Sequence, residues 1–217
     1  MLEITGIFNK PFRKWKDLLR VKRNYETLLK ENTDLLNKKF GGQAPPSSFS
    51  ITSARIVSRH TGAYKNFIIL DKGKADGIHV SDGVWTSEGA VGVVSSVSEH
   101  FSKVFLLRHP TVTLSVKLDK PGHYGFTNWK MNGEKLIRVV DIPVEADVQA
   151  GDTVRTSGMS LIFPENIPVG HVVGVVDTEG EGKVLKVRPF ADIDRISYVY
   201  IGFHPRREEL KKIINEP

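Results

Sequence analysis

Residues 80–94 read VSDGVWTSEGAVGVV, a pattern typical of paired β-strands. Short runs rich in Val favour strands, and the Asp82-Gly83 dipeptide between them favours a turn. A second stretch has the same pattern: Val148-x-x-Gly151 leads into the VRTS sequence of residues 154–157, and a VGVV run follows at 173–176. Any two hairpins can share such residues, so the repeat supports, without proving, two β domains of similar build.

Twelve short segments with β character follow residue 48, and turn dipeptides such as Asp76-Gly77 and Asn132-Gly133 separate them. They lie near residues 49–58, 66–70, 83–87, 90–98, 103–108, 112–118, 123–128, 135–141, 152–156, 170–177, 183–189 and 197–203. No helical period of useful length occurs after residue 41. An all-β body is therefore expected, and twelve strands divide evenly into two closed barrels of six.

Ahead of the strands, residues 12–39 contain neither Pro nor Gly and carry a heptad pattern. One register runs through Leu18, Val21, Tyr25, Leu28, Asn32, Leu35 and Lys39; another, equally apolar, runs through Trp15, Leu18, Lys22, Tyr25, Leu29, Asn32 and Leu36. A lone Asn at a seam position selects a parallel, in-register dimer. We expect a homodimer whose contacts are made by Leu18, Tyr25, Leu28, Asn32 and Leu35. The alternative is an amphipathic helix that lies on its own domain.

These patterns predict a mainly β protein, with an N-terminal coiled-coil helix followed by two small six-stranded β-barrel domains. The expected divisions are residues 1–40 for the helix, 41–48 for a Gly/Pro/Ser linker, 49–122 for the first barrel, 123–204 for the second barrel and 205–217 for a polar C-terminal tail. A strand at 197–203 is a second candidate for completing the first barrel.

Composition and charge exclude several classes of protein. The chain has 217 residues, no Cys and a net charge of +6, and no apolar run is longer than four residues. Disulfide scaffolds and thiolate metal sites are thereby excluded, and no segment is apolar enough to cross a bilayer. Residues 1–40 carry ten Lys or Arg against five Asp or Glu, so most of the excess positive charge belongs to the helical segment. Its basic stretch between Lys10 and Arg23 lacks a base-reading pattern, and no nucleic acid is expected as a partner.

The sequence contains no recognisable catalytic or cofactor-binding motif. G-x-S-x-G, H-E-x-x-H and phosphate-binding glycine loops are all missing, and the seven His are not at metal-ligand spacing. We therefore expect no enzyme activity, cofactor or metal. The apolar loop residues Leu161, Ile162 and Phe163 either plug a barrel end or contact a partner protein.

Several short motifs between about Ala54 and Gly202 together resemble the rod shape-determining protein MreC family. They include residues 66–73 (NFIILDKG), residues 89–94 (GAVGVV), Asp141-Ile142-Pro143, Gly151-Asp152-Thr153-Val154 and Ile162-Phe163-Pro164-Glu165. All occur in family order, with the heptads ahead of them.

The resemblance implies a scaffold of the bacterial cell-elongation machinery on the periplasmic side of the inner membrane. It implies a coiled-coil dimer whose barrels present strand edges and apolar loops to the class B penicillin-binding transpeptidase of elongation and to MreD. Higher-order self-association stays open. Family members have a transmembrane helix before the coiled coil, so we expect an anchor that precedes residue 1. A periplasmic adaptor of an export complex and, further behind, a two-barrel serine hydrolase are the alternatives.

Overall fold

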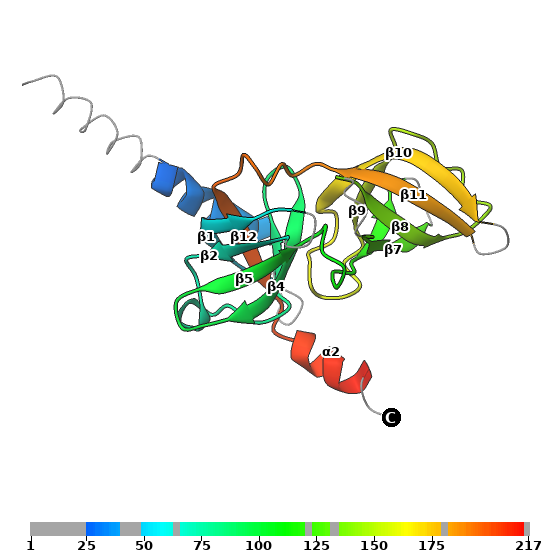
Figure 1. Ribbon diagram of the computed structural model, residues 1–217. Coiled ribbons are helices and arrows are strands. Elements are labelled where there is room, and N and C mark those ends of the chain that lie inside the picture. Colours follow the sequence, from blue (N-terminus) through cyan, green and yellow to red (C-terminus); the bar gives the residue numbers. More distant parts are fainter. Residues whose placement is uncertain are drawn as a thin grey trace, which may run out of the picture.

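The computed structural model describes residues 25–39, 49–62, 66–119, 123–130, 135–178 and 182–214. Its described residues form two closed six-stranded barrels that lie side by side (Figure 1). A helix over residues 25–39 packs on the first barrel, and a second helix, α2 (Arg207–Ile214), projects beneath it. The predicted fold class, two six-stranded barrels behind an N-terminal helix, is confirmed.

The first barrel combines strands from both ends of the chain. Its strands are β1 (Ser50–His60), β2 (Phe67–Leu70), β3 (Gly83–Trp85), β4 (Ala90–Val97), β5 (Ser102–Leu106) and β12 (Tyr198–Phe203). They close in the order β1-β12-β3-β4-β5-β2, so the last strand of the chain lies between β1 and β3.

The second barrel is contiguous in sequence. Its strands are β6 (Ser115–Leu118), β7 (Tyr124–Asn128), β8 (Ile137–Ile142), β9 (Thr153–Thr156), β10 (Pro168–Thr178) and β11 (Gly182–Pro189), closed in the order β10-β11-β8-β7-β6-β9. Because β6 pairs with β7 and β9, the boundary between barrels lies between Leu106 and Ser115. The expected boundary at residue 122 is therefore wrong by one strand. The expectation of free strand edges is also wrong, because closed barrels have none.

The alternation of buried and exposed side chains explains why these strands curl into barrels. In β7, Gly125 and Thr127 are buried, whereas Tyr124 and Phe126 point outward. Inward positions of the other strands are mostly branched apolar residues, such as Ile68 in β2 and Leu185 in β11. A six-stranded barrel has room only for side chains, so both interiors are packed cores.

The two barrels share an apolar contact. Trp85 of β3 lies against Phe163, whose ring is in the loop between β9 and β10, with 6.1 Å between ring centroids. Both side chains belong to one buried cluster that continues into the interior of the second barrel. This contact fixes one barrel against the other through buried area.

The C-terminal segment differs from the expected polar tail. Residues 207–214 form α2, and Arg207 at its start is 1% exposed. The helix has only two turns and begins shortly after Pro205, so its sequence period is too short to be recognised. No helix among the described residues is long and apolar enough to span a bilayer.

Candidate interaction surfaces

The helix of residues 25–39 uses one face to hold the first barrel. The side-chain amide of Asn37 donates to the carbonyl of Ile51 at 3.0 Å, and its oxygen accepts the Ile51 N–H at 2.7 Å. Leu36 packs against the buried cluster, and the rings of Tyr25 and Tyr198 are 4.9 Å apart. The helix therefore lies on its own domain.

The neighbouring face of this helix, which adjoins the barrel-facing side at Tyr25, carries the predicted seam. Tyr25, Leu28 and Leu35 are 45%, 55% and 60% exposed, and Asn32 between them is exposed as well. In the alternative register, Leu29 and Leu36 are half-buried toward the barrels. The structure therefore leaves Leu28, Asn32 and Leu35 of the first register exposed, whereas Tyr25, which both registers share, also lies against Tyr198 of the first barrel. Leu18, the basic stretch and the linker at 41–48 lie outside the described residues.

A groove of 580 Å³ borders this seam face. Leu28 and Asn32 of the helix line one side, Trp85 and Thr86 line the floor, and Arg155 of the second barrel lies on the other side. A helix laid along the seam would thus also reach both barrels.

The predicted partner residues Leu161, Ile162 and Phe163 lie in the loop of residues 158–167, which is held between the barrels. Phe163 is 2% exposed, and Leu161 and Ile162 are half-buried. The carbonyl oxygen of Ile162 approaches Gly83 so closely that a Cβ at residue 83 would lie 2.3 Å from it. Phe163 is therefore a packing residue between the barrels in this conformation, and it presents no surface to a partner.

The same loop is braced by a single hydroxyl. Thr156 Oγ1 donates to the carbonyl of Pro164 at 2.6 Å and accepts the N–H of Ile167 at 2.9 Å. Leu161 and Asn166 hold positive φ angles of 53° and 71°, which suit the tight turns of the loop. The two hydrogen bonds and the turns hold the loop in one conformation between the barrels.

The outer wall of the second barrel exposes two aromatic rings that the sequence analysis did not single out. Tyr124 and Phe126 on β7 are each 45% exposed. Phe126 lies opposite Val140 of β8, and Arg138 of β8 lies opposite Lys186 of β11. We call these five residues the aromatic face. The sequence YGFTN could have predicted these exposed rings, because its two aromatic residues alternate with small residues that fit the barrel interior.

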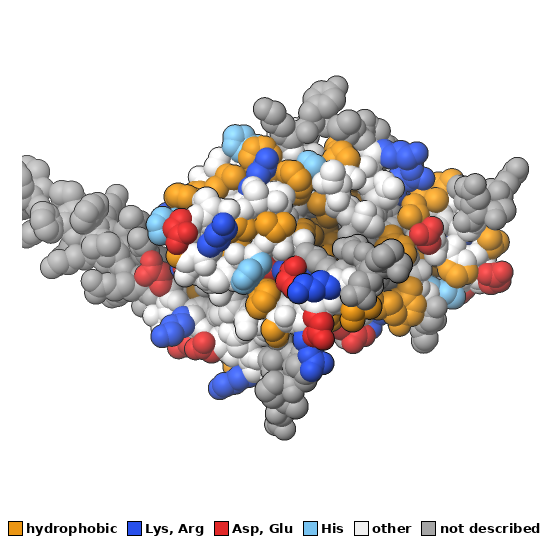
Figure 2. Space-filling model, turned by 90° about the horizontal axis from the view of Figure 1, so that it is seen from below, with side chains coloured by type: hydrophobic (Ala, Val, Ile, Leu, Met, Phe, Trp, Pro, Cys, Tyr) orange, Lys and Arg blue, Asp and Glu red, His pale blue; other side chains and the backbone are white. Residues whose placement is uncertain are grey.

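One face of the molecule mixes charged and apolar side chains. On the side of the molecule seen in Figure 2, hydrophobic side chains reach the surface over both barrels, between scattered acidic and basic side chains. Exposed aromatics next to Arg are enriched in protein interfaces relative to the rest of a protein surface.

A serine and a histidine meet on the exposed wall of β1, where Ser58 Oγ lies 3.0 Å from His60 Nε2. The imidazole of His60 stacks on Phe67, with centroids 4.4 Å apart, and no described carboxylate bonds to it. A nucleophile–base pair needs a group that orients the base and a cleft for substrate. The described residues also contain no cluster of three or more His, Asp or Glu that could hold a metal.

Comparisons with known proteins agree with this architecture. The family model described as "Rod shape-determining protein MreC, barrel core" matches residues 56–202. The cell shape-determining protein MreC of Caulobacter vibrioides is 31% identical over 189 residues, covering 84% of this chain and 51% of the relative. That of Escherichia coli is 27% identical, covering 75% and 46%. The chain thus spans about half the length of the curated relatives it matches.

Solved structures show the same fold. The crystal structure of MreC from Pseudomonas aeruginosa superposes with a TM-score of 0.63 at 26% identity, covering 70% of this chain and 97% of that one. A complex between penicillin-binding protein PBP2 and MreC from Helicobacter pylori contains a chain with a TM-score of 0.60 at 20% identity, covering 73% of this chain and 99% of that one.

Proposed function

The chain belongs to the MreC family of rod shape-determining proteins, and we propose that it is a non-catalytic scaffold of bacterial cell elongation. The observation that carries the proposal is the exposed apolar pair Leu28 and Leu35, with Tyr25 at its edge, on a helix attached to two closed barrels. Such a molecule can join chains and present rigid surfaces. We propose that it works on the periplasmic side of the inner membrane.

Homodimerisation is the first part of this function. In the dimer, Tyr25, Leu28, Asn32 and Leu35 of one helix pack against the same residues of a second copy, and Leu18 extends the seam. The half-buried positions of Leu29 and Leu36 support this register, because those residues already pack toward the barrels. The exposed seam residues would bury their apolar area only against a partner.

Binding of the elongation transpeptidase is the second part. A penicillin-binding protein forms a complex with the Helicobacter pylori MreC, and this chain is proposed to bind the corresponding class B transpeptidase of its own organism. The aromatic face is the contact that the geometry supports best, because Tyr124 and Phe126 are exposed on β7, and Arg138 lies on the adjacent strand opposite Asn128. Leu161 and Ile162, both half-buried, are proposed as a secondary contact, whereas Phe163 is buried between the barrels and is not proposed to touch the partner. MreD is proposed as a further partner, and association of dimers with one another is also proposed. Neither is assigned to a surface of the molecule.

The experiment is a binding titration of the chain against the purified extracytoplasmic part of that transpeptidase, with molecular mass read in parallel. Wild type is expected to bind as a dimer. Phe126→Ser together with Tyr124→Ser should weaken binding about tenfold or more, since exposed aromatics are frequent anchors of interfaces. Phe101→Ser is the matched control, because Phe101 is 50% exposed on the first barrel.

Three outcomes would count against the proposal. Equal affinity of the aromatic-face variant and the wild type would exclude this surface. Absence of saturable binding by a folded dimer would exclude the transpeptidase as a direct partner of this part of the protein. Hydrolysis of an ester or peptide substrate that is lost in Ser58→Ala would show that the chain is an enzyme.

A further inference from the structure

A cleft of 590 Å³ opens where the two barrels meet the segment that returns from β11 to β12. Its floor is apolar and belongs to the first barrel, with Val91, Leu106 and Leu107 all buried. Its size is that of an ordinary ligand pocket.

Backbone hydrogen bonds fix the walls of this cleft. The N–H of Leu107 donates to Val91 at 3.0 Å, and the N–H of Phe190 donates to Val169 at 3.1 Å. The buried side chain of Asn66 donates to the carbonyl of Arg108 at 2.6 Å, which anchors Arg108 at the end of β5. A cleft formed in this way is present before any ligand arrives, so binding costs little ordering.

Three cationic side chains line the cleft: Arg108, Lys135 and Arg188. Among the described residues, no carboxylate lies within ion-pair distance of any of the three. The carboxylates of Asp192 and Asp194 also line it, so the cations of the lining exceed its acids by one, and the carboxylate of Asp192 is in addition paired with Arg195 at 3.3 Å. Elsewhere on the barrels, cations such as Arg155 and Lys117 each have an acidic partner. The lining of the cleft therefore carries positive charge that the described part of the chain does not neutralise.

Apolar groups accompany this charge at the surface. Phe190 is 37% exposed at the rim, and Leu136 beside Lys135 is half-buried. A small inorganic anion or a purely charged polymer would use the cations and leave these two side chains in water. A peptide with both acidic and apolar side chains would use both kinds of group.

We propose that this cleft binds an acidic, extended segment of a partner protein, whose carboxylates pair with Arg108, Lys135 and Arg188 while an apolar side chain packs on Phe190. Charge complementarity selects the segment and speeds its encounter with the cleft, and the apolar floor contributes the buried area. The inference does not rest on the contact with the transpeptidase, which the aromatic face would make.

The test is fluorescence anisotropy of the full 217-residue chain with a labelled ten-residue peptide of alternating Glu and Leu. A peptide with Gln in place of every Glu is the ligand control. The variant Arg108→Gln, Lys135→Gln, Arg188→Gln is compared with Lys30→Gln, Lys38→Gln, Lys212→Gln. This matched control removes the same net charge from exposed positions outside the cleft.

The acidic peptide is expected to bind wild type saturably and the Gln peptide about tenfold more weakly. The cleft variant should lose about tenfold in affinity while the control variant changes less than about twofold. Phe190→Ser should weaken the Glu-Leu peptide but leave binding of polygalacturonate, an anionic polymer without apolar groups, unchanged.

Several outcomes would overturn the proposal. Equal losses of peptide affinity in the cleft variant and the control variant would mean that the net charge of the protein alone attracts the peptide. Equal binding of the Gln peptide would remove the role of the carboxylates, and cleft-dependent binding of polygalacturonate without any binding of the peptide would point to another class of ligand. Should the triple variant not fold, Lys135→Gln with Arg188→Gln, both exposed, answers the same question. Tyr124→Ser with Phe126→Ser is expected to keep peptide binding, which separates this site from the aromatic face.

Discussion

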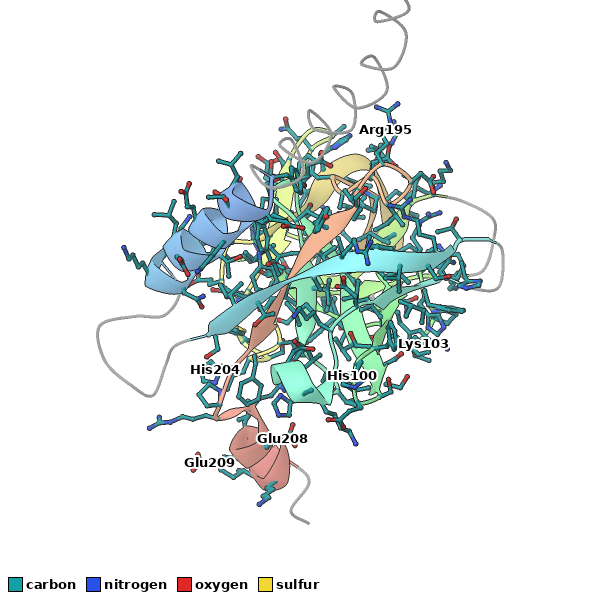
Figure 3. All side chains as sticks on the ribbon, turned by 90° about the vertical axis from the view of Figure 1, so that its left-hand side faces the viewer. His100, Lys103, Arg195, His204, Glu208 and Glu209 are labelled. Carbon is teal, nitrogen blue, oxygen red and sulfur yellow. The ribbon has the colours of Figure 1, made fainter. Side chains whose placement is uncertain are left out.

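Arg207 is the residue that ties the C-terminal helix to the first barrel. Its guanidinium, 1% exposed, donates to the carbonyls of Ser81 at 2.9 Å and Val80 at 3.1 Å and lies 2.8 Å from the carboxylate of Asp82. Burial raises the pKa of Asp82, and hydrogen bonds from the His79 N–H and from Arg207 oppose that rise. Figure 3 shows α2 at the end of the barrel opposite Arg195, with Glu208 and Glu209 on it.

Removal of this guanidinium should be strongly destabilising. Arg207→Ala leaves the Asp82 carboxylate buried without its cation, so we expect a loss of about 3–5 kcal/mol in the free energy of unfolding. Arg207→Lys should recover only part of it, because one ammonium cannot reach two carbonyls and a carboxylate in the same geometry. Urea denaturation measures both. The neighbouring Arg206→Ala, at an exposed position, is the control, and equal losses at 206 and 207 would contradict the buried pairing.

The imidazole of His109 is partly buried against a neighbouring ring, which affects its protonation. Its ring stacks on Phe105 with centroids 3.7 Å apart, and burial, followed by the nearby charge of Lys103, lowers its pKa from 6.5. A lowered pKa means that the unfolded chain binds the proton more readily. The stabilisation from His109 is therefore complete above pH 6.5 and is lost as the pH falls through the folded-state pKa.

NMR titration of the His109 ring should give a pKa below 6.5 in the wild type and a higher value in Lys103→Met. Lys186→Met, on the second barrel, is the matched control and should leave the His109 pKa unchanged. A shift of the same size in both variants would assign the effect to net charge instead of to Lys103.

The local sequence pattern located the strands but did not show which strands pair with one another. All twelve predicted strand segments correspond to observed strands, because the alternation of Val, Ile and Thr is a local property. Membership of a barrel depends on pairing between distant residues. Val116 and Leu118 of β6 alternate as any strand does, and nothing local shows that they pair with β9. The boundary therefore could not be read from the sequence.

The contact between β3 and the loop at 158–167 gives a prediction about these elements. A methyl group at Gly83 would lie 2.3 Å from the backbone oxygen of Ile162 and 3.1 Å from the ring of Phe163. Gly83→Ala must displace the loop, so we expect a loss of about 1–3 kcal/mol in stability. Gly62→Ala is the control, since a methyl group there would meet no atom within 4 Å beyond its chain neighbours. Thermal unfolding with equal midpoints for the two variants would contradict the tight packing of the loop.

At the scale of the whole molecule, function depends on which faces the barrels leave exposed. Phe163 and Phe126 are both aromatic residues in β-rich sequence, yet the first is buried between barrels and the second is exposed. Their local sequences do not distinguish them, because the packing of one barrel on the other decides the burial of Phe163. The sequence predicts a seam through Tyr25, Leu28 and Leu35, because the helical period is a local property. The choice between the two heptad registers depends on the tertiary structure, in which Leu36 packs against the buried cluster.

The exposed seam predicts that the chain is a dimer in solution. Wild type should have a mass in solution of twice the 24.3 kDa of one chain, and Tyr25→Asp with Leu28→Asp should reduce it to that of one chain. Buried carboxylates in the seam would face their own copies, which like-charge repulsion and desolvation both disfavour. Lys30→Asp with Lys38→Asp changes the same helix away from the seam and should keep the dimer. Asn32→Leu should raise dimer stability while admitting other oligomers, because the lone Asn fixes register at a cost in stability. An unchanged mass in the Asp variant would mean that the exposed face of the helix pairs with something other than a second copy of the chain.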